Sequence, residues 1–282
     1  MLESKPRHFH LVGTTPMAST LVGIPRLMHH TFPPYGSCIY CGRTDDLRTE
    51  HIVPYGLEGN LKLPRSTCGE CADRTSRIER AVLRGDFRVV RVYRGLQSRR
   101  KHAGAPELYA LNITRDGQEQ QVEVLLDEYP VVLHFPIYPP PRILTTSEKR
   151  PGVDIRGVDT ISFGPNPLEV MKKLGAQSIG ATLSQRPAEF ARMIAKIAYA
   201  MAAATGTLKL LAESSELPAM ILGEDDAIGH FVGTIEEPNA SHPEIHRVLL
   251  IEDRGRGLLI GDVQIFSDSH TPRYGVVIGK LA

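Results

Sequence analysis

The stretch that decides the fold is residues 38–71, which read CIYCGRTDDLRTEHIVPYGLEGNLKLPRSTCGEC. It opens with the pair Cys38 and Cys41, closes with the pair Cys68 and Cys71, and contains all four cysteines of the chain. Two Cys-x-x-Cys pairs separated by 26 residues are typical of a tetrahedral zinc site, because each tight turn supplies two thiolates. Four thiolates leave no open position on the ion, so the spacing predicts a structural zinc. Any chemistry is then left to the residues that the zinc positions.

The composition is that of a globular protein. The chain has 282 residues, of which 41% are hydrophobic, enough for one or two domains with a real core. Lys and Arg number 33 and Asp and Glu 32, so the net charge of +1 gives no argument for a nucleic-acid partner by itself. The N-terminus shows no signal pattern, and the most apolar stretch, residues 193–204, is too short to span a membrane. With every cysteine inside the metal motif, none is left for a disulfide, and we expect a cytoplasmic protein.

The predicted fold class is α+β, with a small zinc-bound treble-clef module followed by a mixed α+β domain that contains an antiparallel sheet. Three regions are expected: a flexible lead-in over residues 1–30, the zinc module over residues 31–86 and an accessory domain over residues 87–282. Met28 lies just before the zinc module and is a candidate for the natural start of the protein.

The spacing of apolar residues and glycines gives an order of elements. Residues 47–53 are expected as a strand, and the second cysteine pair opens a helix that continues to Gly85. A knuckle, a hairpin and a helix that carries the second knuckle follow one another as in a treble clef. Asp116-Gly117 predicts a hairpin turn. Further strands are predicted over residues 87–93, 108–113, 122–126, 248–251, 258–260, 263–266 and 274–278, and helices over residues 167–174 and 187–205.

The dipeptide Glu50-His51 lies between the two cysteine pairs, at the end of the first expected strand. It belongs to the string EHIVP, which is followed by GLEG at residues 56–59 and by LP at residues 63–64. In this order, and between two cysteine pairs, these motifs resemble the HNH endonuclease family, whose ββα-metal site is often built on a four-cysteine treble clef. The resemblance covers roughly residues 36–82, less than a fifth of the chain.

The resemblance implies roles for individual residues. His51 matches the general base that takes a proton from the attacking water, which suits imidazole because its ordinary pKa lies near neutrality. Glu50 matches the acidic residue that ligates a catalytic Mg²⁺ or Mn²⁺. Asn60 is the nearest match to the central Asn of the family. The position after the last cysteine, commonly Asn or His, is Ala72, so Asp73 is the candidate for the missing metal ligand.

Positive charge gathers on the helix that the second cysteine pair opens. Its arginines recur at steps of three and four residues: Arg74, Arg77, Arg80 and Arg84. This spacing places them on one helix face, where they are candidates for contacts with nucleic-acid phosphates. Three more arginines continue onto the next expected strand: Arg88, Arg91 and Arg94. The alternative is a solvated surface whose charges pair with acidic neighbours such as Glu79.

Three functional hypotheses follow from the sequence. The first is an HNH-type endonuclease that hydrolyses DNA phosphodiester bonds with His51 as the general base, a divalent metal and a structural zinc. The second is a catalytically degenerate zinc module that binds nucleic acid or a protein partner, which Ala72 favours. The third is a sensor over residues 87–282 that controls the nuclease, which makes this C-terminal domain a candidate surface for a homo-oligomer or a regulatory partner.

Overall fold

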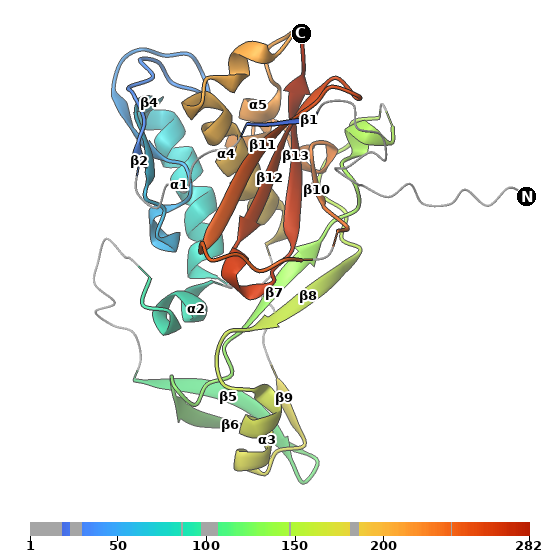
Figure 1. Ribbon diagram of the computed structural model, residues 1–282. Helices are drawn as coiled ribbons and strands as arrows, with labels where there is room; N and C mark the ends of the chain where they lie inside the picture. Colours follow the sequence, from blue (N-terminus) through green and yellow to red (C-terminus); the bar gives the residue numbers. More distant parts are fainter. Residues whose placement is uncertain are drawn as a thin grey trace, which may run out of the picture.

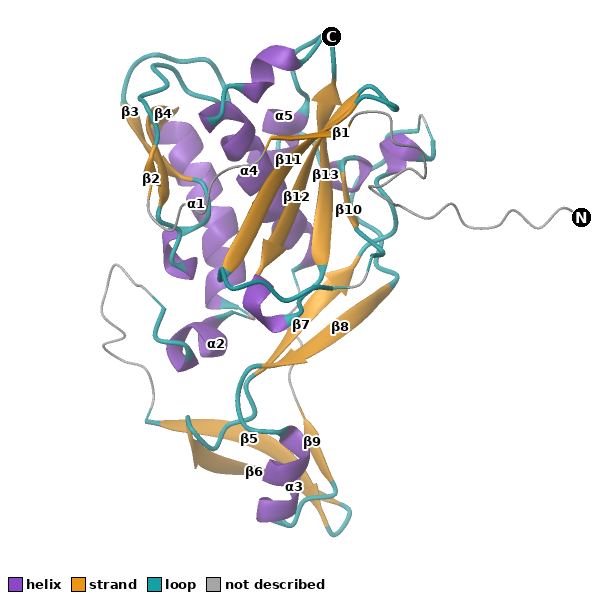
Figure 2. Cartoon of the chain, in the orientation of Figure 1, coloured by secondary structure: helices purple, strands orange, loops and turns teal. Residues whose placement is uncertain are grey.

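Figure 1 shows the computed structural model of the chain, which describes residues 19–22, 30–85, 87–96, 107–146, 148–180, 186–237 and 239–282. Most of the predicted lead-in over residues 1–30, including Met28, lies outside these ranges. The described part combines helices with antiparallel sheets (Figure 2), which confirms the α+β class. None of its helices has both the length and the apolar character needed to cross a membrane.

The two cysteine pairs are carried by a small sheet and a long helix. The elements are β2 (His30–Thr31), β3 (Leu47–His51), the 3₁₀ helix η1 (Tyr55–Leu57), β4 (Leu61–Cys68) and α1 (Gly69–Arg84). The symbol η denotes a 3₁₀ helix throughout. Strand β4 pairs antiparallel with β3 and parallel with β2, and α1 follows it directly. The strand predicted over residues 47–53 is confirmed but ends at His51, and the predicted helix is confirmed up to Arg84.

The strand predicted over residues 87–93 is wrong, because this segment forms helix α2 (Arg88–Tyr93). Apolar residues alternate with arginines there, which is the pattern of a half-exposed strand. In the structure Val90 is fully buried, and the side chain of Arg91 turns inward to donate a hydrogen bond of 2.6 Å to the carbonyl of Gly56. Such tertiary contacts outweigh the weak local preference of a short segment.

Residues 107–180 contain two small sheets. The elements are β5 (Leu108–Arg115), β6 (Gln118–Leu125), β7 (Val132–Ile137), η2 (Arg142–Leu144), β8 (Gly157–Ser162), α3 (Pro167–Leu174) and β9 (Ser178–Gly180). Strands β6, β5 and β9 form one antiparallel sheet that shares a small hydrophobic cluster with α3, and β7 pairs with β8. The predicted hairpin at Asp116-Gly117 is confirmed, with φ values of +52° and +71° at its two turn residues.

The largest sheet has five antiparallel strands in the order β1-β11-β12-β13-β10. Its strands are β1 (Ser19–Val22), β10 (Val232–Thr234), β11 (His246–Asp253), β12 (Leu258–Ile265) and β13 (Arg273–Lys280). The remaining elements are α4 (Pro187–Ala204), η3 (Thr207–Leu210), α5 (Leu217–Leu222), η4 (Ile228–His230) and η5 (Ser267–Ser269). The strands predicted over residues 248–251 and 274–278 lie within β11 and β13, whereas those predicted over 258–260 and 263–266 belong to the single strand β12, which ends at Ile265. Both predicted helices are present as α3 and α4.

Helix α4 lies between α1 and the large sheet (Figure 1) and is buried along most of its length. Small residues allow the close approach, since a Cβ atom at Gly261 of β12 would lie only 2.5 Å from the Cβ of Ala198. One hydrophobic cluster runs from the cysteine segment through α4 into the large sheet. The regions predicted as a zinc module (31–86) and an accessory domain (87–282) therefore share one core.

A histidine ties the large sheet to the loop that follows β3. Nε2 of His246 lies 2.6 Å from the carbonyl oxygen of Leu57, and Nδ1 lies 3.1 Å from the backbone nitrogen of Phe266. A backbone N–H only donates, so Nδ1 accepts and Nε2 carries the proton that is donated to Leu57. Burial lowers the pKa of His246 to about 4, although the Leu57 carbonyl acts in the opposite direction. The folded protein therefore holds this imidazole neutral.

We expect acidification to destabilise the protein between pH 6.5, the ordinary pKa of histidine, and about pH 4. Over this window the unfolded chain binds a proton that folded His246 does not bind. The free energy of unfolding therefore decreases as the pH is lowered, by at most about 3 kcal/mol. Denaturant unfolding at several pH values measures the slope. His246→Gln should have a shallower slope, whereas His270→Gln, at an exposed site, should keep that of the wild type. Equal slopes in all three proteins would contradict the prediction.

Candidate functional site

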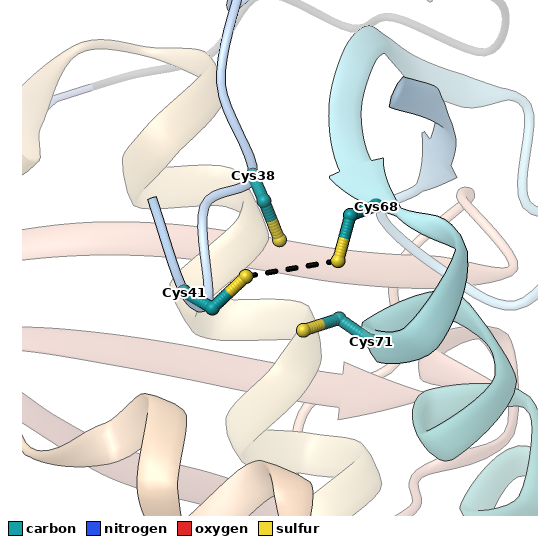
Figure 3. A group of neighbouring side chains, drawn as sticks. All are labelled: Cys38, Cys41, Cys68 and Cys71. Carbon is teal, nitrogen blue, oxygen red and sulfur yellow. Dashed lines mark hydrogen bonds between the residues drawn. The ribbon is translucent and has the colours of Figure 1, made fainter. Parts of the chain in front are cut away.

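The four cysteine thiols converge in one place (Figure 3). Their Sγ atoms all lie within 4.8 Å of one another, and those of Cys41 and Cys68 are 3.6 Å apart. Tetrahedral zinc, with bonds of about 2.3 Å to sulfur, spaces its ligands about 3.8 Å apart. The cluster can therefore hold a metal ion such as zinc. Within the described ranges, no other group of three or more His, Cys, Asp or Glu side chains gathers its ligand atoms in this way.

Backbone turns and a helix start hold the thiols at this spacing. In the first pair, the N–H of Gly42 donates to the carbonyl of Cys38 at 2.8 Å, and Gly42 has a φ of +76°, which glycine adopts without strain. The N–H of Cys38 donates in turn to the carbonyl of Arg43 at 2.7 Å. In the second pair, Cys68 precedes α1 and Cys71 lies in its first turn, where the helix dipole favours a thiolate.

The surroundings of the thiols oppose ionisation in some positions and favour it in others. Cys38, Cys68 and Cys71 are buried, and Cys41 is exposed. Burial raises the pKa of Cys71 and, to a smaller extent, that of Cys41. Burial also acts to raise the pKa of Cys68, but hydrogen bonds from Cys71 and the other thiols outweigh it and lower the pKa. A divalent cation removes this conflict, because it binds all four sulfurs as thiolates.

On the core side of β3, the side chain of Lys196 connects α4 to β3 and α1. Its Nζ lies 2.5 Å from Oε1 of Glu50 and 2.9 Å from Oε1 of Glu79. The hydroxyl of Thr67 on β4 donates to the other carboxylate oxygen of Glu50 at 2.7 Å. Together we refer to Lys196, Glu50, Glu79 and Thr67 as the lysine cluster.

The lysine cluster is buried, and it sets two carboxylates against a single ammonium. The side chains of Lys196 and Glu50 are 2% and 7% exposed, and that of Glu79 is 21% exposed. Burial alone would lower the pKa of Lys196, but the charges of Glu50 and Glu79 outweigh it and raise the pKa, so the ammonium stays charged. Removing one member of such a buried pair is costly, because an uncompensated charge then remains in the core.

The predicted general base points away from the lysine cluster. His51 follows Glu50 along β3, so its side chain lies on the opposite face of the strand. It is half-buried, and its ring packs edge-on against Tyr55 with the ring centroids 5.6 Å apart. Asn60 is half-buried just before β4, where its carbonyl accepts a hydrogen bond of 3.3 Å from the N–H of His30. The catalytic roles of His51 and Asn60 stay predictions.

The two residues predicted to ligate a catalytic Mg²⁺ or Mn²⁺ do not fit that role as they lie. Both carboxylate oxygens of Glu50 are engaged, one by Thr67 and one by Lys196. Asp73 is exposed on α1 and pairs with Arg48 at 3.5 Å. Among the residues described, neither belongs to a group of three or more ligand side chains. A second, catalytic metal is therefore without support in this arrangement.

Two residues of α4 are important to the site but absent from the candidates chosen by sequence. Lys196 appears in the sequence only as a charge within an apolar helix pattern, which signals a buried acidic partner without identifying it. Tyr199 donates its hydroxyl to the carbonyl of Ile39 in the first cysteine turn at 3.0 Å. It also stacks on Tyr40, with ring centroids 6.1 Å apart. Both residues attach α4 to the cysteine segment.

The predicted basic face of α1 divides into paired and unpaired arginines. Arg74 pairs with Glu224 at 2.6 Å and with Glu70 at 3.3 Å. Arg77, Arg80 and Arg84 are exposed, and no ion pair joins them to any acidic residue in the described ranges. The unpaired arginines therefore form a positive row on the outer face of the helix.

The three later arginines do not act as one group. Arg88 is exposed at the start of α2. The guanidinium of Arg91 faces the core, and that of Arg94 forms a two-fold ion pair with Asp268. Of these three arginines, only Arg88 is therefore exposed.

No protein-family model, no curated protein and no solved structure matches the chain. The site is therefore interpreted from its own geometry. That geometry consists of a cysteine cluster, a buried lysine cluster and a row of exposed arginines on α1, the helix that contributes to both clusters.

Replacing one cysteine of each pair, as in Cys38→Ser with Cys68→Ser, is expected to abolish metal binding. Residues 36–84 should then unfold at least in part, because small metal-held segments fold together with their ion. Metal analysis and circular dichroism measure both effects. Thr44→Ala, at an exposed position after the first turn, is the control and should keep its metal. A wild-type protein that is stable and free of metal would overturn the prediction.

Proposed function

We propose that this chain is a nucleic-acid-binding protein in which a zinc-held treble-clef unit, formed by β3, β4 and α1, presents a basic helix face to the phosphates of DNA. The observation that carries the proposal is the exposure of Arg77, Arg80 and Arg84 without acidic partners in the described ranges. Guanidinium groups that no carboxylate of the described residues neutralises are able to displace the counterions of a phosphate backbone.

The geometry of α1 suits a polyanion. From Arg77 to Arg84 the helix advances about 10 Å, and one strand of DNA carries a phosphate about every 3.4 Å of its axis. The cysteine cluster holds the first turn of α1, and α4 packs against the buried side of the helix. A rigid row of this kind contacts several phosphates but no base edges, so we infer binding that depends on salt and is indifferent to sequence.

Replacing Arg77, Arg80 and Arg84 together with alanine is expected to weaken binding to duplex DNA by about tenfold or more at low salt. The plot of log affinity against log salt concentration should also become shallower by about 2 to 3, since each lost phosphate contact contributes about 0.9. Fluorescence anisotropy with a labelled duplex over a salt series measures both.

The matched control replaces three exposed cations on other elements with alanine: Lys172, Lys209 and Arg254. It has the same net charge as the α1 variant and should bind like the wild type. If both variants lose affinity equally, total charge and not the α1 face governs binding, and the proposal is wrong.

A second candidate function is hydrolysis of DNA by an HNH-type endonuclease, which the position of His51 favours. Its half-exposed imidazole at the end of β3 lies in the same hairpin and helix unit as the arginine row, where it can take a proton from water beside a bound phosphate. A catalytic divalent metal would need Glu50, and Lys196 already occupies that carboxylate. We therefore derive no step through a metal.

Plasmid nicking in Mg²⁺ and in Mn²⁺ separates the two functions. If the chain only binds, the wild type, His51→Ala and His270→Ala should all bind DNA equally and none should nick it. His270 is an exposed histidine at the edge of η5 and serves as the control. Nicking by the wild type and His270→Ala but not by His51→Ala would establish the nuclease and overturn the binding-only proposal.

A further inference from the structure

The lysine cluster has the composition of a cation site. Four oxygen atoms surround Nζ of Lys196: one carboxylate oxygen each from Glu50 and Glu79, and the backbone carbonyl oxygens of His51 and Ile52. Carboxylate and carbonyl oxygens are the ligands that Mg²⁺, Ca²⁺ and Mn²⁺ prefer in proteins. An ammonium has only three protons to donate, so these acceptors saturate it.

The cluster holds more negative than positive charge. Glu50 and Glu79 bring two carboxylates against the single ammonium of Lys196. Tyr40 is 7% exposed, and its hydroxyl has no hydrogen-bond partner among the described residues. Burial raises the pKa of Tyr40, and the charges of Glu50 and Glu79 raise it further, which places the ring in the field of both carboxylates. A cation with two charges would match the carboxylates better than lysine does.

We propose that this cradle of four oxygens is a divalent-cation site in which the ammonium of Lys196 takes the place of the ion. The protein then carries its cation on α4 and takes up no Mg²⁺ or Mn²⁺ at Glu50. This inference goes beyond the proposed binding of nucleic acid and does not rest on it, because it concerns only the surroundings of Lys196. Removing the ammonium while keeping the oxygens turns the cradle into a site for a divalent ion.

The arrangement of the donors supports the exchange. Glu50, His51 and Ile52 are consecutive residues at the end of β3, and Glu79 faces them from α1. Strand pairing with β4 and the bond from Thr67 hold Glu50 and the adjoining backbone, so the oxygens that β3 supplies are expected to keep their places when the lysine side chain is shortened. The space left by the side chain is then open to an ion with its own water ligands, as Mg²⁺ and Mn²⁺ usually retain.

The test compares Mn²⁺ binding by the wild type and Lys196→Ala, followed by electron paramagnetic resonance and by calorimetry. Lys196→Ala is expected to bind one Mn²⁺ per chain, at least about tenfold more tightly than the wild type, and to melt at a higher temperature when Mn²⁺ is added. The melting temperature of the wild type should not change. Zinc is quantified before and after the titration, because thiolates favour zinc over Mn²⁺ and the cysteine cluster should keep its own ion.

Two further variants locate the site. Adding Glu50→Gln to Lys196→Ala should remove the Mn²⁺ binding again. Lys149→Ala is the matched control, because Lys149 also lies between two carboxylates, those of Glu216 and Asp225, each at 2.8 Å, but at a more exposed position. It should gain no comparable site, and an equal gain would show that the cradle has no special geometry and would overturn the proposal.

The remaining outcomes are equally decisive. Mn²⁺ binding by the wild type that Glu50→Gln abolishes would show that lysine does not replace the ion. A folded Lys196→Ala that binds no Mn²⁺ would also overturn the proposal, as would a variant that fails to fold both with and without Mn²⁺. Folding of Lys196→Ala only when Mn²⁺ is present would support it. None of these results depends on whether the protein binds or cleaves DNA.

Discussion

The buried ion pairs of Lys196 are the constraint on which the placement of the cysteine segment depends. The ammonium belongs to α4, and its carboxylate partners come from β3 and α1. Separating a buried charge from its partner is costly, so an arrangement of the three elements that brings these groups together is favoured over one that separates them. On its other side, α4 lies against β12 through the contact between Ala198 and Gly261. Helix α4 thus fixes the pair of strands β3 and β4 and the large sheet relative to each other.

The two clusters that flank the hairpin concentrate negative charge in different ways. Four thiolates around one divalent ion would leave two negative charges beside Arg43, whose pKa is raised by Asp45 and by Cys68. The carboxylates of Glu50 and Glu79 share the single ammonium that α4 supplies. The arginines that have no ion pair within the described part of the chain begin beyond the first turn of α1, away from the thiolates. In the proposed complex with DNA, the phosphates would therefore contact the later turns of α1 and not its first turn.

Local sequence predicts the parts of this structure that depend on local interactions. The spacing of the cysteines, the turn at Asp116-Gly117 and the periodicity of α3 and α4 all identify features that are present. The alternation over residues 87–93 is misleading, because a mixture of valines and arginines fits either a strand or a short helix. In the helix that forms, Arg91 turns toward the core.

The interior of the site could not be predicted in the same way. Strand alternation implies that Glu50 and His51 point to opposite faces, but it does not say which face is covered or by what. In the structure, Lys196 of α4 covers the face of β3 that carries Glu50. This contact depends on the packing of β3, α1 and α4, which lie far apart in the sequence. From the sequence, Glu50 is therefore a candidate metal ligand. In the structure, the same carboxylate forms an ion pair with Lys196.

The bond from the hydroxyl of Tyr199 to Ile39 joins the first cysteine turn directly to the most buried helix. If the cysteine cluster holds a metal ion, loss of that ion would therefore affect more than a loop at the surface. It would also disturb one of the contacts that join α4 to the cysteine segment. In that case the resistance of this segment to proteases would depend on the supply of the ion.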